Sequence, residues 1–278
     1  MTEQWQRTEL ETCFYERAAE GVVVLTLNRP DKGNSVVPEM ARDLMSVIDT
    51  LESDRSVRAV VLTGAGRQFS AGADMVEMRN YLRDRLAIEQ EPYNARVLFP
   101  VTQRLTNSRL VFVAAINGGA TAGGLDFALA CDIRVASDRA KLGETYINMG
   151  LAPGNGGTWF LPRLVGSGMA AELALTGEVV KADRALEIGL VGRVVPHDEL
   201  IGAAVEIATK VASKPWRALE ATKQALRASW QLDLAAAMSA SFWTVSALYH
   251  TDDLHEAVNA YVDKRPPQFN KDVSPPSA

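Results

Sequence analysis

Two short segments rich in glycine and alanine occupy equivalent places in the sequence. Residues 69–75 and residues 117–126 each follow an apolar run typical of a buried strand, and each opens a helix. The backbone N–H groups at the start of a helix have no partner within that helix, so two sets of free donors can converge on one negatively charged oxygen. Small residues are needed there, because a Cβ would hold a ligand away from the backbone. The segments therefore predict an oxyanion-binding site made of main chain, at the ends of strands that lead into helices.

The remaining expected elements follow the same strand–turn–helix order. A helix is expected to begin at Pro38, because apolar residues recur at helical spacing between charged ones from Met40 to Leu51. Apolar and β-branched runs predict four strands, at residues 21–28, 57–63, 110–116 and 132–137, and further helices at residues 125–131 and 159–164. This rhythm is typical of an α/β fold with parallel crossover connections.

Two stretches depart from that rhythm. From residue 200 onward helices dominate, so we expect an α/β core in residues 1–199 and a helical C-terminal region in residues 200–278. Residues 77–103 are charged and compatible with helix, but Pro92 and Pro100 interrupt the pattern. We interpret this stretch as a lid or flank beside the site.

Composition excludes several classes of function. The chain has 278 residues, 47% of them apolar, and a formal charge of −5 without a long Lys/Arg run, which argues against nucleic acid or an anionic membrane as the main partner. No apolar signal core or bilayer-length run is seen, so we expect a cytoplasmic protein. Cys13 and Cys131 are expected to stay reduced. The three histidines lie far along the chain from the glycine segments, so we expect no metal site.

Four motifs in order resemble one known family. Residues 28–35, 69–74, 116–132 and 150–157 are similar to the successive signatures of the crotonase superfamily, the enoyl-CoA hydratases and isomerases. The resemblance runs from about residue 21 to the C-terminus. It implies a crotonase-like ββα spiral core and a helical C-terminal oligomerisation region that builds trimers or dimers of trimers. It also implies an acyl-CoA thioester substrate, with no cofactor besides the coenzyme A of that substrate.

The resemblance also implies roles for individual residues. The two oxyanion donors map onto the N–H groups of Ala73 and Gly123, which would bind the thioester oxygen as negative charge develops on it. By the same pattern the residues that contact the CoA substrate are Arg29, Lys32, Asn34, Ala71, Asp74, Met75, Gly124, Lys264 and Phe269. Arg29 and Lys32 could instead be solvated turn residues. Lys264 and Phe269 could close the site of a neighbouring subunit or simply form a polar helix end.

The acid–base positions differ from those of the family. The hydratase pattern has one glutamate in the helix after the second glycine segment and another twenty residues later; this chain has Asp126 and Tyr146 there. Asp126 can act as a general base or cap its helix, whereas a phenol is a poor base near neutral pH. Glu144 lies two residues before Tyr146 and would face the same side if the chain is extended there, so it is either the missing carboxylate or an ordinary surface acid.

These residues predict an enoyl-CoA hydratase or isomerase that stabilises a thioester enolate. Asp126 with Glu144 would form a carboxylate pair, whereas Asp126 with Tyr146 would suit other enolate chemistry. A crotonase-type decarboxylase, C–C hydrolase or lyase therefore remains an alternative. So does a non-catalytic acyl-CoA-binding or scaffold protein, because a standard glutamate is absent.

Overall fold

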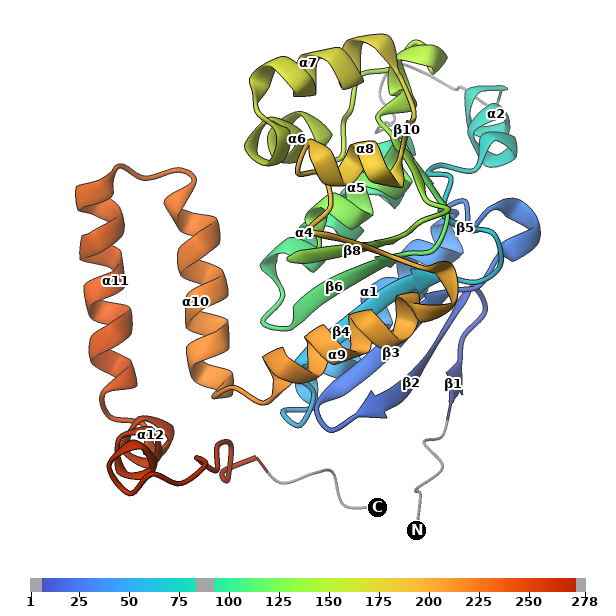
Figure 1. Cartoon of the computed structure of the whole chain (residues 1–278). Coiled ribbons are helices and arrows are strands. Elements are labelled where there is room, and N and C mark those ends of the chain that lie inside the picture. Colours follow the sequence, from blue (N-terminus) through green and yellow to red (C-terminus); the bar gives the residue numbers. More distant parts are fainter. Residues whose placement is uncertain (1–6, 84–92, 274–278) are drawn as a thin grey trace.

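The structure is a computed structural model that describes residues 7–83 and 93–273. A seven-stranded sheet forms the centre of this part of the chain, in the order β1-β2-β3-β4-β6-β8-β11 (Figure 1). Neighbouring strands from β3 to β11 run parallel, and β1 and β2 extend one edge in antiparallel pairing. The strands are β1 (Thr8–Glu9), β2 (Cys13–Ala19), β3 (Val22–Leu27), β4 (Ala59–Gly64), β6 (Val111–Ile116), β8 (Ile133–Ser137) and β11 (Arg193–Val195).

A second, smaller sheet lies at the ends of the central strands, in the order β10-β9-β7-β5. Along the chain β4 is followed by β5, β6 by β7 and β8 by β9, so each of these three central strands precedes one short strand of the small sheet. A helical segment follows each pair, which gives the repeated ββα unit of a spiral and confirms the expected α/β class. The short strands are β5 (Gln68–Ser70), β7 (Gly119–Thr121), β9 (Lys141–Gly143) and β10 (Val180–Lys181).

The large sheet is buried on both faces, which explains its β-branched strands. On β3 the side chains of Val23 and Leu25 join the larger core cluster, which includes residues of α1, α4 and α5, whereas Val22 and Val24 pack with Ala204 and Ala208 of α9. Alternation along each strand thus supplies two apolar layers. The helices of these layers are α1 (Pro38–Ser53), α4 (Phe99–Asn107), α5 (Gly123–Ala130) and α9 (Leu200–Ala212).

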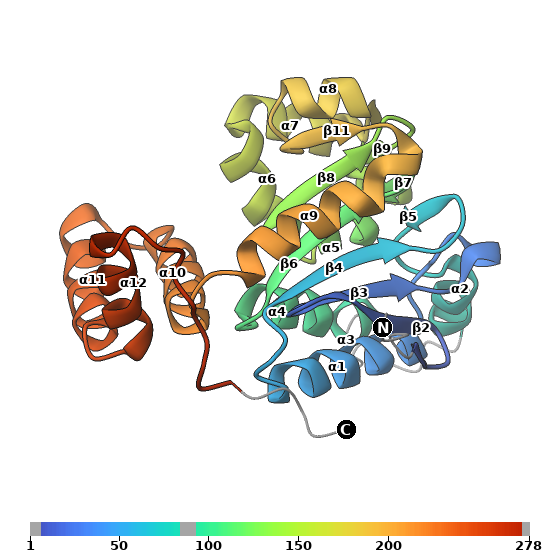
Figure 2. The ribbon, with the colours of Figure 1, turned by 60° about the horizontal axis from the view of Figure 1, so that its bottom comes forward.

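The other helices lie around the spiral or beyond it. Three helices, α10, α11 and α12, project to one side of the core and form an arm (Figures 1 and 2). The remaining helical segments are η1 (Pro30–Lys32), α2 (Met75–Arg83), α3 (Tyr93–Val97), η2 (Thr145–Met149), α6 (Gly157–Val165), α7 (Ser167–Thr176), α8 (Ala182–Glu187), η3 (His197–Glu199), α10 (Trp216–Ser229), α11 (Leu234–Leu248) and α12 (Asp252–Val262).

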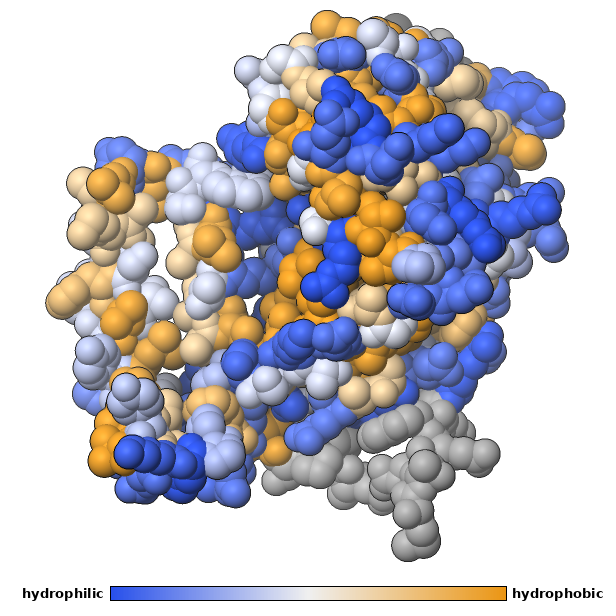
Figure 3. Space-filling view, viewed as in Figure 1, coloured by the Kyte–Doolittle hydropathy of each residue, from blue (hydrophilic) through white to orange (hydrophobic). Residues whose placement is uncertain are grey.

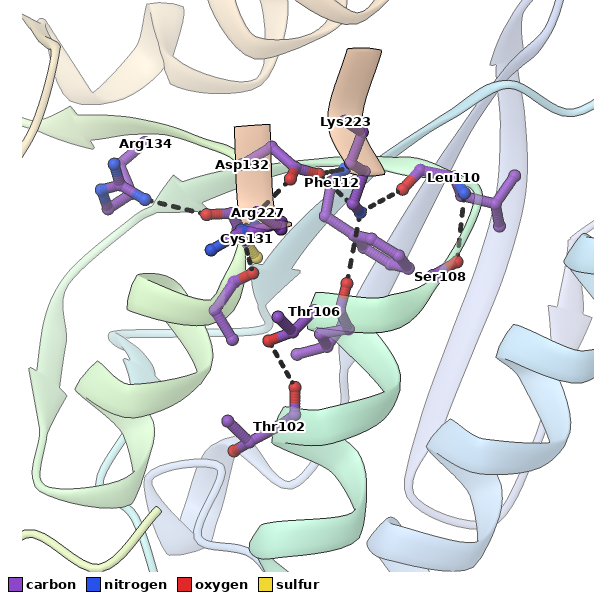
Figure 4. A network of polar contacts seen from close by, with 12 residues as sticks. Thr102, Thr106, Ser108, Leu110, Phe112, Cys131, Asp132, Arg134, Lys223 and Arg227 are labelled. Atoms are coloured by element: carbon purple, nitrogen blue, oxygen red, sulfur yellow. Dashed lines mark hydrogen bonds and ion pairs between the residues drawn. The ribbon is translucent and has the colours of Figure 1, made fainter. Parts of the chain in front are cut away.

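A buried polar network attaches the arm to the core (Figure 4). Lys223 of α10 is 7% exposed, and its Nζ lies 2.8 Å from Asp132 Oδ2 and donates to the Leu110 carbonyl at 2.6 Å. Arg227, one turn later, donates to the Ala130 carbonyl and to Asp132 Oδ1. A buried ammonium needs such partners, because burial alone lowers its pKa. Asp132 directly follows the C-terminal end of α5, so the arm is anchored to the helix that carries Gly123 and Asp126.

Most of the expected elements are confirmed, with some corrections. The strand at residues 21–28 is preceded by β1 and β2 and is therefore not the first element. Pro100 lies in the first turn of α4 and so begins a helix rather than interrupting one. Helix α9, which we grouped with the C-terminal region, packs on the central sheet. Residues 84–92 of the expected lid, Pro92 included, lie outside the described residues.

Two further expectations concern cysteines and membranes. Cys13 and Cys131 are both buried and unpaired, as expected for reduced thiols. Within residues 7–83 and 93–273, every helix is too short or too polar to span a bilayer.

Candidate active site

The first glycine segment presents a free backbone donor at Ala73. The Val36 N–H donates to the Gly72 carbonyl at 2.7 Å, and the Asp74 N–H donates to the Val36 carbonyl at 3.1 Å. These two bonds form an isolated parallel bridge between Val36 and Ala73. In such a bridge the middle residue directs its own N–H to the opposite side, away from Val36. Ala73 thus offers its N–H to a ligand.

The second glycine segment presents a donor at Gly123. The Ala122 N–H donates to the Gly143 carbonyl at 2.9 Å, and the chain then turns into α5 at Gly123. Since Gly123 is the first residue of the helix, its N–H has no carbonyl one turn earlier to bond. The Leu98 side chain covers this residue, with its Cδ1 2.6 Å from the place where a Cβ on Gly123 would lie.

The two segments touch along their backbones. A Cβ on Gly72 would lie 2.9 Å from the Gly123 nitrogen, and a Cβ on Gly124 would lie only 2.0 Å from the Ser70 carbonyl oxygen. Gly72 also has a φ of +83°, which side chains rarely allow. Glycine at these positions therefore permits the approach that places the Ala73 and Gly123 donors beside each other. The predicted oxyanion pair is brought together in space.

A hydrogen-bonded chain of three side chains ends at Asp126, which lies one turn beyond Gly123 on α5. The Tyr146 hydroxyl donates to Asp126 Oδ2 at 2.5 Å, and Asn155 Nδ2 donates to the Tyr146 oxygen at 2.5 Å. Tyr146 comes from η2, and Asn155 comes from the glycine-rich loop before α6. All three are buried, with Asp126 0%, Asn155 1% and Tyr146 4% exposed. The sequence did not lead us to Asn155; its only signal was an amide side chain within the glycine-rich loop at residues 150–157.

Glu144 joins this group from the other side of Asp126. A Cβ on Gly157 would lie 2.6 Å from Glu144 Oε1 and 2.7 Å from Asp126 Oδ1, so both carboxyls converge on the first residue of α6. Glu144 is 1% exposed and is therefore not a surface acid. The chain is not extended between these residues, because η2 begins at Thr145; the side chains of Glu144 and Tyr146 nonetheless both reach Asp126.

Several polar atoms at this point have no hydrogen-bond partner among the described residues. They are Asp126 Oδ1, both carboxyl oxygens of Glu144 and Asn155 Oδ1. Buried polar atoms are normally paired, and exceptions concentrate where a proton or ligand is exchanged. Three of these four atoms belong to the two carboxyls.

Burial shifts the pKa values of Asp126, Glu144 and Tyr146. It raises the pKa of Asp126 and raises that of Glu144 further, since the Asp126 charge adds to the effect on Glu144. The hydrogen bond from Tyr146 acts in the opposite direction on the Asp126 pKa. Burial, together with Asp126, also raises the pKa of the Tyr146 phenol, which therefore keeps its proton. Of the two carboxyls, Asp126 accepts the Tyr146 hydrogen bond and is therefore the more readily ionised, and Glu144 is the more readily protonated.

Arg29 and Asn34, two of the residues expected to contact CoA, already make polar contacts within the protein. Arg29 donates to the Ser35 carbonyl and pairs with Asp74 at 3.1 Å. Asn34 is fully buried, and its amide bonds the Ala65 and Gln68 carbonyls. These groups hold the turn itself, so contacts to a ligand would use their remaining atoms or the backbone.

The other expected CoA residues of the core differ in their exposure to solvent. The Asp74 carboxylate caps α2 through the Val76 N–H at 2.9 Å, and its hydrogen bonds lower its pKa against the opposing effect of burial. Met75 and Lys32 are exposed, and Ala71 is half-buried beside Ala73. Gly124 is packed against the Ser70 backbone.

Lys264 and Phe269 lie far from this site within one chain. Both belong to the segment that follows α12, and Figures 1 and 2 show α12 at the end of the arm, away from α2 and β5. Lys264 is exposed and Phe269 is half-buried. A contact with CoA from these residues stays a prediction and requires the arm of a second copy.

The sequence as a whole matches a family model described as enoyl-CoA hydratase/isomerase, over residues 17–272. The chain belongs to this family. It is 38% identical over 258 residues to a short-chain-enoyl-CoA hydratase of Clostridium acetobutylicum, covering 92% of this chain and 97% of that relative. It is 35% identical to the 2,3-dehydroadipyl-CoA hydratase of Escherichia coli, covering 89% and 94% of the two chains.

A solved structure supports the same conclusion. The crystal structure of an enoyl-CoA hydratase from Bacillus anthracis superposes on this family member with a TM-score of 0.87 and 35% sequence identity. The match covers 93% of this chain and 99% of the other. The resemblance to the crotonase superfamily is thereby confirmed, together with the crotonase-like fold and an acyl-CoA thioester as the class of substrate.

Proposed function

We propose that this chain adds water reversibly across the α,β double bond of a short enoyl-CoA thioester, using Asp126 as the base and Glu144 as the acid. The observation that carries the proposal is the convergence of the two buried carboxyls beside Gly157. A pair of groups whose environments push their pKa values apart is suited to divide acid and base roles. Relatives named as hydratases of short acyl groups support the choice of substrate.

The proposed reaction has two proton transfers. Asp126 Oδ1 takes a proton from water as the water oxygen bonds to the β-carbon, and the π electrons move toward the thioester oxygen. The Ala73 and Gly123 N–H groups stabilise that oxygen as an enolate. Glu144 then gives its proton to the α-carbon, and the proton on Asp126 passes to Glu144 to restore the pair. The acid, the base and the oxyanion donors all come from the chain, and no electrons are gained or lost, so the proposed reaction needs no further cofactor.

The test is incubation of the protein with crotonyl-CoA in deuterated water. We expect the 3-hydroxy product, with deuterium at the α-carbon, because the proton that Glu144 delivers originates in solvent. The measurements are loss of the enoyl absorbance and mass spectrometry of the product. Deuterium exchange without net hydration would favour a double-bond isomerase, in which Asp126 and Tyr146 act on an enolate. Binding of the thioester with neither reaction would overturn the catalytic proposal for this chain length and favour a binding protein.

We also propose that the arm mediates association into a trimer or a dimer of trimers. Large apolar side chains on α11 and α12 are exposed, Trp243 at 74% and Tyr261 at 86%, and Figure 3 shows hydrophobic residues along the arm. Exposed apolar surface of this kind marks an interaction site. A second copy is the expected partner, since the family resemblance places oligomer contacts in this region.

Sedimentation or light scattering measures this association directly. We expect a mass that is three or six times the chain mass of 30.2 kDa. Trp243→Glu should shift the mass toward the monomer, since it places a charge in the contact. Trp243→Phe, which keeps the side chain apolar, should leave the mass unchanged. A wild-type protein that stays monomeric at micromolar concentration would contradict the proposal.

A further inference from the structure

The hydrogen-bond chain from Asn155 to Asp126 has a fixed direction. A phenol has one proton to donate, and Tyr146 gives it to Asp126 Oδ2 at 2.5 Å. Asn155 Nδ2 donates to the Tyr146 oxygen from the other side, also at 2.5 Å. Because an amide N–H can only donate, it occupies an acceptor site of the phenol oxygen and favours the rotamer in which the hydroxyl points at Asp126. The chain ends on one carboxyl of the pair.

Glu144 receives no comparable donor. Neither of its carboxyl oxygens has a hydrogen-bond partner among the described residues, although the side chain is 1% exposed. A buried carboxylate without donors is costly, whereas a carboxylate that accepts a charge-assisted bond is stabilised. The two carboxyls of the pair therefore differ in their donors rather than in their burial.

The other groups packed against Asp126 add no charge beside the carboxyl pair. Within the part of the chain that the structure describes, the titratable groups acting on Asp126 are Tyr146 and Glu144. Helix α4 packs on α5, and the residue before it, the uncharged Leu98, lies against Gly123. Helix α6 adds the Gly157 backbone N–H, which also lowers the pKa of Asp126. The short strands β5 and β7, which also contact α5, contain no ionisable residue.

We infer that Asn155 is a positioning residue that acts through Tyr146 and determines which carboxyl is the base. Its amide orients the phenol, the phenol stabilises the Asp126 carboxylate, and the shared proton stays on Glu144. This inference rests on the proposed function, because it concerns the division of acid and base roles in that reaction. It explains how a chain with tyrosine at the second acid–base position can still hold one ionised and one protonated carboxyl.

The test compares Asn155→Ala, Asn155→Asp and Tyr146→Phe with the wild type. Two readouts are used: the pH at which kcat/KM falls on the acid side, and the titration of the Asp126 carboxyl by carbon-13 NMR of aspartate-labelled protein. The Asp126 resonance is identified by its absence in Asp126→Asn. Thr158→Ala, at an exposed position of α6, is the matched control and should shift neither value.

We expect both values to move upward by about one pH unit in Asn155→Ala and Tyr146→Phe, the effect of one lost hydrogen bond to a charged group. Asn155→Asp should move them further, because its carboxylate would accept the phenol proton and turn it away from Asp126. In a Tyr146→Phe background, Asn155→Ala should add only a small further shift, since the two residues act as one chain.

The outcomes separate this inference from the proposed function. Wild-type protein that hydrates crotonyl-CoA while Asn155→Ala keeps the wild-type titration of Asp126 would overturn the inference alone. Wild-type protein without turnover would overturn the proposed function, and the NMR titration would still decide the role of Asn155. If Asn155→Ala does not fold, Asn155→Asp decides, because it keeps the shape of the side chain and removes the amide donor.

Discussion

Asp126→Asn is expected to lower kcat/KM for enoyl-CoA hydration by about 10²–10⁴-fold, the usual contribution of a general base. Asparagine keeps the shape of the side chain and can still accept the Tyr146 hydroxyl bond. It cannot take a proton from water. The fall should therefore lie in kcat, with KM nearly unchanged, because the proposed thioester contacts at Ala73 and Gly123 are intact.

The pH profile gives this prediction a second measurement. Asp126 must be ionised, so wild-type activity is lost as the pH falls through its raised pKa; Glu144 must be protonated, so activity is lost as the pH rises through its own raised pKa. The profile should be bell-shaped. Residual activity of Asp126→Asn should lack the acid limb, whereas Glu144→Gln, the matched variant, should lack the alkaline one. An acid limb retained in Asp126→Asn would assign the base to another group.

The same variant should be more stable than the wild type. A carboxyl whose pKa is raised in the folded state binds more protons there than in the unfolded state, so its contribution to the free energy of unfolding falls as the pH rises through that pKa. Removing the charge of Asp126 removes this penalty. We expect the Tm of Asp126→Asn to exceed that of the wild type at neutral pH, with the difference shrinking below pH 5. A lower Tm with lost activity would indicate misfolding instead.

The sequence predicted the fold best where local pattern and final environment agree. The stripe from Met40 to Leu51 on α1 is buried as expected, because one helix face meets one core. Strand β2 escaped notice because Cys13–Ala19 is only partly buried and carries charged residues, so it lacks the apolar run of β3. Strands β5, β7 and β9 have three residues each, too few for any periodicity to show.

The candidate site was likewise predictable only in part. The backbone donors at Ala73 and Gly123 were predictable, because they need only glycine-rich turns ahead of helices. Asn155 was not, since its partner Tyr146 reaches it only through the fold of the loop before α6. The choice between Glu144 and Tyr146 could not be made from spacing, because η2 changes the direction of the chain between them. The structure brings both to Asp126, which makes the two alternatives parts of one group.

Gly123→Pro is expected to lower kcat by about 10²–10³-fold, the cost of losing one oxyanion donor. Gly123 is the first residue of α5, where proline is well tolerated and where its missing N–H breaks no helical hydrogen bond. The substitution thus removes the proposed donor without breaking a helical hydrogen bond, and its backbone cost falls on Ala122, whose φ of +48° and ψ of −123° are unusual before proline. No side-chain deletion can make this change, because the group is main chain.

The matched control is Gly123→Ala. Either substitution places a Cβ 2.6 Å from Leu98 Cδ1, the far end of a flexible side chain that must rotate away, so both share the steric cost. Only proline removes the N–H. Steady-state kinetics on crotonyl-CoA, with circular dichroism to confirm folding, should therefore show the alanine variant well above the proline variant. Equal rates in two folded variants would mean that the Gly123 N–H does not bind the thioester oxygen. A rate difference between two folded variants with matching Tm values would instead tie the loss to the backbone nitrogen of Gly123, because alanine and proline place the same Cβ against Leu98.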